Sequence, residues 1–151
     1  MLRTIRTGAP LVLAALLGFT SSSNAELKLP RVSPGATVSQ TIGTTDLTVE
    51  YSRPGVKGRV IWGDLVPFDK PWRTGANEAT RFTTTDAITF GGQPLPAGTY
   101  ALLTIPAKDE WTIVLNSEKD LWGAFQYKPD KDVLRFKSPI GLTVDLRGTA
   151  A

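Results

Sequence analysis

The residues best equipped for chemistry lie close together between positions 53 and 79. Arg73, Asn77 and Glu78 share one short phrase, and three cations precede them on the same stretch: Arg53, Lys57 and Arg59. Arginine offers a planar fork of donors for carboxylate, phosphate or sugar hydroxyls, and Asn and Glu complete a hydrogen-bonding site. The structural alternative is a buried, paired Arg73 and Glu78 that fasten the stretch to a sheet. For this pair we favour the structural alternative.

Two glycines surround one of these cations. Gly55 and Gly58 flank Lys57, so the backbone there, with Arg53 and Arg59, could form a small anion-binding nest. The simpler interpretation is a turn that carries solvated charges, and we prefer it.

Paired carboxylates are the weaker chemical candidates. A glycoside hydrolase needs an acid and a second carboxylate roughly 5 to 10 Å apart across a cleft, and Glu50 and Glu78 are the pair to consider. Asp130 and Asp132 could hold calcium, but Lys131 between them makes a solvated turn the better interpretation. We therefore expect no metal site and name no firm catalytic residue.

Four tryptophans could stack on sugar rings: Trp62, Trp72, Trp111 and Trp122. Trp111 alternates in phase with Ile113 and Leu115, which indicates a core position. Aromatic side chains are also the commonest large packing units, so a core role is favoured over a platform. Trp62 and Trp72 lie on the long loop and are less constrained, and Trp72 stays among the candidate ligand-binding residues.

The chain contains no cysteine and no histidine. This excludes Ser-His-Asp and Cys-His catalysis. It also removes the usual nitrogen and sulfur ligands of zinc, copper and haem. We expect no cofactor, and carboxylate, lysine, tyrosine or backbone chemistry is what remains.

The first 25 residues have the order of a cleavable export signal. Arg3 and Arg6 precede an apolar run at 11–19, and Ala25 ends a small-residue cleavage site. The run is too short to span a bilayer, so we expect no anchor after cleavage and a periplasmic or secreted protein. Of 17 basic and 14 acidic residues, the leader removes two basic ones. The balanced remainder gives no reason to expect nucleic-acid binding.

Short alternating strands separated by Gly and Pro turns dominate the remaining 126 residues. We expect strands near 38–42, 47–51, 81–85, 87–90, 99–105, 111–115 and 133–136, with at most one helical turn at 118–122. An edge segment is expected at 94–96, and one long irregular loop at 53–79. The pattern predicts one all-β domain, an antiparallel sandwich or jelly-roll-like fold, over 26–151.

Four phrases in the chain resemble a known bacterial family, domain of unknown function 2911. They are Glu50–Arg59 (EYSRPGVKGR), Trp72–Thr80 (WRTGANEAT), Leu95–Tyr100 (LPAGTY) and Trp122–Ala124 (WGA). The resemblance runs from about 30 to 136 and implies an exported β-rich domain without an assigned reaction. The tail at 137–151 does not resemble the family's ending, and we interpret it as truncated or frame-shifted.

Together these observations favour a binding or scaffolding domain over an enzyme. The loop 53–79 is the expected recognition surface, with a carbohydrate, a peptide or a small anion as ligand. A carboxylate-dependent glycan hydrolase is the first alternative, and a purely structural domain is the second.

Overall fold

Alternation of apolar and polar residues produces most of the strands in this chain. The computed structural model describes residues 29–139, so the expected leader and most of the atypical tail lie outside the described residues. The elements are β1 (Gly35–Ile42), β2 (Thr45–Ser52), β3 (Thr80–Thr84), β4 (Ile88–Phe90), β5 (Gln93–Leu95), β6 (Gly98–Pro106), β7 (Glu110–Asn116), the 3-10 helix η1 (Pro129–Lys131) and β8 (Asp132–Pro139).

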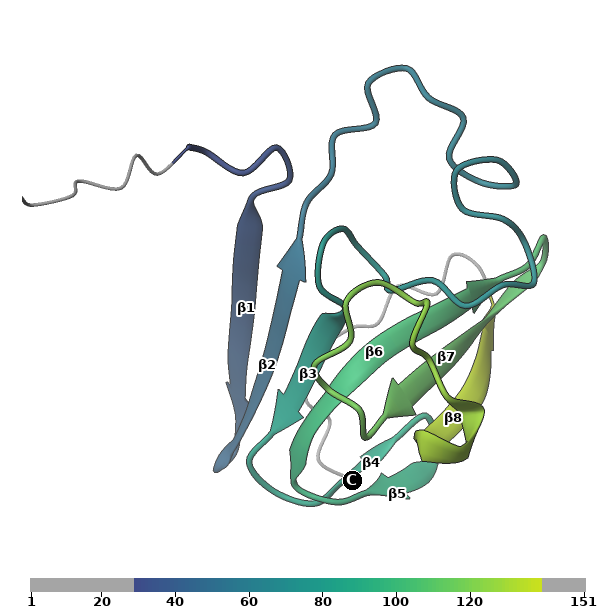
Figure 1. Cartoon of the computed structure of the whole chain (residues 1–151). Coiled ribbons are helices and arrows are strands. Elements are labelled where there is room, and N and C mark those ends of the chain that lie inside the picture. The colour runs from purple at the N-terminus through teal and green to yellow at the C-terminus, as the bar shows by residue number, and fades with distance from the viewer. Residues whose placement is uncertain (1–28, 140–151) are drawn as a thin grey trace, which may run out of the picture.

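Six strands form one open antiparallel sheet in the order β1-β2-β3-β6-β7-β8. Strands β4 and β5 form a separate two-stranded ribbon. Figure 1 shows the six strands side by side, with the chain between β2 and β3 extending beyond the upper end of the sheet. The predicted all-β class is confirmed.

Each face of the sheet carries its own core. Neighbouring residues of a strand point to opposite faces, so Tyr100 and Ala101 of β6 belong to different cores. The first core lies under the β4–β5 ribbon and comprises Phe82, Leu95, Tyr100, Leu115 and Leu134. The second core lies on the opposite face and comprises Ala79, Ala101, Leu103, Val114 and Leu121. The β4–β5 ribbon thus covers the core on one face of the sheet, and the loop at 117–128 covers the core on the other face.

Glycine makes the β4–β5 turn possible. Gly91 and Gly92 have φ of 58° and 77°, a region that glycine adopts without strain. A Cβ on Gly91 would overlap the ring of Phe136, whereas a Cβ on Gly92 would meet nothing within 4 Å. The ribbon therefore sits directly against β8.

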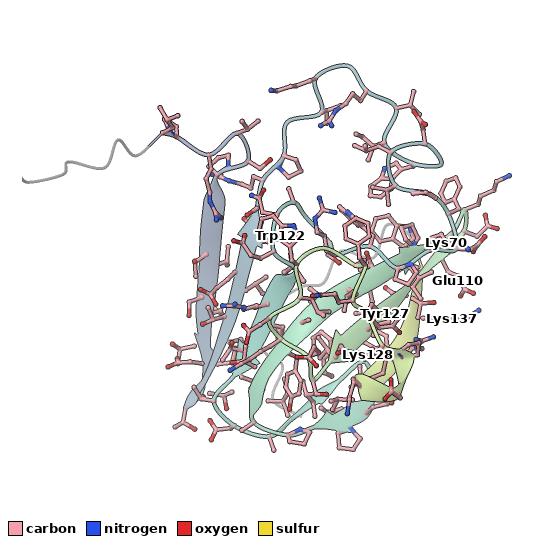
Figure 2. The ribbon with its side chains drawn as sticks, viewed as in Figure 1. Lys70, Glu110, Trp122, Tyr127, Lys128 and Lys137 are labelled. Atoms are coloured by element: carbon pink, nitrogen blue, oxygen red, sulfur yellow. The ribbon has the colours of Figure 1, made fainter. Side chains whose placement is uncertain are left out.

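The two edges of the sheet differ in chemistry. β1 carries neither charge nor proline, and its Val38 is 56% exposed. β8 carries Arg135, Lys137 and the terminal Pro139, and Lys137 pairs with Glu110 of β7 (Figure 2). Charges and proline protect an edge against pairing with another chain. By this measure β8 is protected and β1 is not.

The long irregular loop expected at 53–79 is confirmed, and its second half is fastened to the sheet. Trp72 pairs with Thr104 through two backbone hydrogen bonds, Trp72 N to Thr104 O at 2.7 Å and Thr104 N to Trp72 O at 2.9 Å. Ala79 N donates to Leu121 O at 2.9 Å. These bonds fix residues 72–79, whereas the first part of the loop extends beyond the upper end of the sheet (Figure 1). Between residues 29 and 139, no helix has the length and apolarity needed to cross a membrane.

Candidate functional site

The loop encloses a pocket of about 600 Å³, which we call the loop pocket. Its walls come from residues 32–33 and from the stretch 54–77. The lining includes three cations (Lys57, Arg59, Arg73), one amide (Asn77), two indoles (Trp62, Trp72) and five aliphatic side chains (Val32, Val56, Ile61, Leu65, Val66). No carboxylate belongs to this lining. The pocket therefore combines positive charge with apolar walls.

Arg73 lines the loop pocket, and no protein group pairs with its side chain among the described residues. Its Nε is buried and has no hydrogen-bond partner among residues 29–139. In that part of the chain no acidic group lies within ion-pair distance of its guanidinium. The backbone nevertheless holds the residue, because Thr80 N donates to Arg73 O at 3.1 Å. The paired Arg73 and Glu78 of the structural alternative are not found.

The backbone around Arg73 adopts a conformation that few residues tolerate. Thr74 and Asn77 have φ of 56° and 61°. The Asn77 side chain offsets part of this strain, since its Nδ2 donates to Ser33 O at 3.2 Å and to Ser52 Oγ at 3.3 Å. Left-handed backbone in a non-glycine residue persists only where surrounding contacts impose it, and such residues cluster at functional sites.

The turn around Lys57 is closed by hydrogen bonds from the side chain of Arg59 to backbone carbonyls of the same turn. Lys57 and Gly58 have φ of 51° and 70°. Arg59 donates from Nη2 to Gly55 O at 2.7 Å and from Nε to Val56 O at 3.1 Å. Arg59 thus closes the turn while Lys57 stays exposed at the rim of the pocket.

Three tryptophans pack together beside the loop pocket. Ring centroids are 5.5 Å apart for Trp62 and Trp72, 4.7 Å for Trp62 and Trp111, and 6.4 Å for Trp72 and Trp111. All three pairs are edge-to-face, a favoured geometry for aromatic rings. The cluster joins the loop to β7 and also supplies two walls of the pocket.

A second pocket of about 460 Å³, the sheet pocket, lies over β1 and β2. Both carboxylates of the hydrolase hypothesis line it, Glu50 and Glu78. Arg31 Nη1 and Nη2 donate to Glu78 Oε2 and Oε1 at 3.1 and 2.9 Å. These hydrogen bonds hold the pKa of Glu78 below its ordinary value. A general acid needs the opposite shift, so this environment suits Glu78 poorly as a proton donor.

Other charged groups hold the loop at 117–128 against the sheet. Arg81 of β3 donates to Asp120 Oδ1 at 2.7 Å. Asp132 accepts hydrogen bonds from Asn116 Nδ2 at 2.8 Å and Tyr127 OH at 2.8 Å, and Arg135 joins the same cluster. Burial raises the pKa of Tyr127 to about 12. Trp122 of this loop forms an isolated bridge with Glu78, and Tyr127 reaches Asp132 of β8 (Figure 2).

The predicted ligand-binding residues divide between the two pockets. Lys57, Arg59, Trp72, Arg73 and Asn77 line the loop pocket. Glu78 lines the sheet pocket with Glu50, and Arg53 lines neither. Three or more His, Asp or Glu side chains arranged for a metal ion are not found within residues 29–139.

Sequence reasoning missed the contribution of residues 31–33. Arg31 holds Glu78 across 47 positions, and Val32 and Ser33 line the loop pocket. No spacing links these residues to the loop, because only the pairing of β1 with β2 brings them there. The aliphatic walls at Ile61, Leu65 and Val66 could have been found from the sequence, because so many apolar residues are unusual in an exposed loop.

Comparison with known proteins gives one match. The model of a family described as protein of unknown function (DUF2911) matches residues 33–144. No curated protein and no solved structure matched the chain.

Proposed function

The chain belongs to the family described as protein of unknown function (DUF2911), a description that assigns no activity, and we propose that it binds a small organic anion in the loop pocket. The ligand carries a carboxylate or phosphate that accepts hydrogen bonds from Arg73. Lys57 and Arg59 add positive potential, and the two indoles contact the remainder of the molecule.

The observation that carries this proposal is the buried, unpartnered Nε of Arg73. A buried donor without a partner costs about 1–3 kcal/mol, so proteins rarely leave one in place. An anion beside Arg73 removes that cost and gains a charge-assisted hydrogen bond. Since no carboxylate lines the pocket, the bound anion meets no like charge.

The fastened loop supports a site that is already formed before ligand arrives. Asn77 is held by Ser33 and Ser52, and Trp72 is held by Thr104. A side chain held in its binding conformation loses little freedom on association, which favours affinity. The left-handed backbone at Thr74 and Asn77 fits the same interpretation.

The other ligand classes fit this pocket less well. A neutral carbohydrate leaves the positive charge unmatched and sets hydroxyl groups against aliphatic walls. A peptide fits through its terminal carboxylate, which makes it one case of an organic anion. The glycan hydrolase remains the second candidate, because Glu50 and Glu78 share the sheet pocket.

The proposal includes export of the binding domain. Residues 1–25 have the order of a cleavable leader, and signal peptidase cleavage after Ala25 creates a mature chain that begins at Glu26. Mass spectrometry of the protein recovered from the periplasm or medium of its host tests this. An N-terminus at Met1 in the mature protein would contradict it.

Titration of purified protein with acetate, benzoate and phosphate, followed by calorimetry and tryptophan fluorescence, tests the site. Arg73→Met should weaken binding by roughly 10-fold or more, since a hydrogen bond to a charged group contributes about 1.5–3 kcal/mol. Arg53→Met is the matched control, because it removes a cation of the same loop that lines neither pocket. Equal losses in the two variants, or no binding of any anion, would overturn the proposal.

A further inference from the structure

We infer that the anion bound in the loop pocket is the head group of a single-chain amphiphile, a linear alkyl chain that ends in a carboxylate or phosphate. This inference rests on the proposed function and adds the chemical class of the ligand. It assigns the head group to Arg73 and the alkyl chain to the aliphatic walls.

The walls of the loop pocket are apolar and uncovered. Among its lining residues, Val32 is 81% exposed, Val56 59% and Leu65 52%. Trp62, which shares this wall, is 44% exposed. Scattered apolar residues on a surface need no explanation, but these four line one concavity. A contiguous apolar concavity of this kind is typical of a site that binds an apolar group of a ligand.

Most polar groups of the same pocket are already engaged in hydrogen bonds to the protein. Arg73 is partly buried, and Asn77 beside it is held by Ser33 and Ser52. Arg59 uses its guanidinium to close the turn at Gly55 and Val56. Among residues 29–139, the pocket thus has one buried donor without a partner, Arg73 Nε, beside a larger apolar part.

The size of the loop pocket supports the same class of ligand. About 600 Å³ falls in the middle of the range for pockets that hold drug-sized molecules, roughly 300–1,000 Å³. An inorganic anion alone would leave most of that volume to water against aliphatic walls. A flexible alkyl chain fills an irregular apolar groove without bringing polar groups that need partners.

A chain-length series tests the inference with the full mature protein. Acetate, hexanoate and decanoate are titrated by calorimetry below their micelle concentrations, with hexyl and decyl phosphate as the second head group. Burial of each added methylene should tighten binding by up to roughly fourfold. Decanol, which has the chain but no anion, should bind at least roughly 10-fold more weakly than the matching anion.

Two variants separate the chain from the head group. Val56→Ser should flatten the dependence of affinity on alkyl chain length. Val38→Ser is its control, since Val38 is 56% exposed, close to the 59% of Val56, but lies on β1 outside the pocket lining. A loss of the chain-length dependence in Val38→Ser as large as in Val56→Ser would contradict the assignment of the chain to this wall.

The outcomes for the inference and for the proposed function are distinct. If acetate and decanoate bind equally well, the amphiphile inference fails and the anion site stands. If no anion binds, or if decanol matches decanoate, the anion site fails as well. Affinity that rises with chain length in the wild type, and less steeply in Val56→Ser, supports both.

Discussion

Arg31 holds Glu78 through two parallel hydrogen bonds, and the carboxylate is thereby directed away from Arg73. The two bonds, at 3.1 and 2.9 Å, link the segment before β1 to the residue that precedes Ala79 and β3. Arg73 lies five positions before Glu78, and the left-handed residues Thr74 and Asn77 stand between the two. Arg73 consequently faces the loop pocket and Glu78 faces the sheet pocket.

Replacement of Arg73 should leave the fold intact. Arg73→Met removes an unpartnered buried donor and keeps most of the apolar contact, so the free energy of unfolding should stay unchanged or rise by up to about 1 kcal/mol. Urea denaturation without ligand measures this. A loss of stability above about 2 kcal/mol would instead assign Arg73 a structural role.

The Arg31–Glu78 pair should make stability depend on pH. Hydrogen bonds from Arg31 lower the pKa of Glu78 in the folded protein below its ordinary value of 4.5. The stability that ionised Glu78 contributes through Arg31 is therefore fully present above the ordinary pKa. It is lost as the pH falls through the lower pKa of the folded state. Denaturation of the wild type and Glu78→Gln should show a difference that shrinks on acidification. A difference that stays constant between about pH 7 and about pH 3 would rule this out.

Asn77 should be costly to replace, and two substitutions separate the reasons. Asn77→Gly loses the hydrogen bonds to Ser33 and Ser52 but tolerates the φ of 61°, so a loss of about 1–2 kcal/mol is expected. Asn77→Ala adds the cost of a left-handed alanine, about a further 1 kcal/mol. Thermal and urea denaturation of both variants check the order. If Asn77→Ala is no less stable than Asn77→Gly, the backbone at position 77 is not strained.

Gly91 and Gly92 offer a matched pair for the β4–β5 turn. Both have positive φ, so alanine at either position should cost about 1 kcal/mol from the backbone alone. Gly91→Ala also presses on Phe136, which should add roughly 1–3 kcal/mol. Equal denaturation midpoints for Gly91→Ala and Gly92→Ala would show that the ribbon does not rest on β8.

The strands were predictable because their signal is local. Leu47, Val49 and Tyr51 alternate with polar residues, and all three lie in β2. The layer arrangement was not predictable, because nothing near Gly91 indicates that Phe136 packs on it. The same limit applies to the site. Lys57, Arg73 and Asn77 were identified from residue type, whereas Arg31 and Val32 reach the pockets only through long-range strand pairing.

The packing of Trp62, Trp72 and Trp111 gives the loop an optical signature. Indoles whose centroids lie 4.7–6.4 Å apart couple their electronic transitions, and the coupling produces paired bands of opposite sign in circular dichroism. Two of these indoles belong to the loop and the third, Trp111, to β7, so the contribution from coupling to Trp111 exists only while the loop rests on the sheet. The protein therefore carries a built-in chromophore that reports loop docking without any attached label.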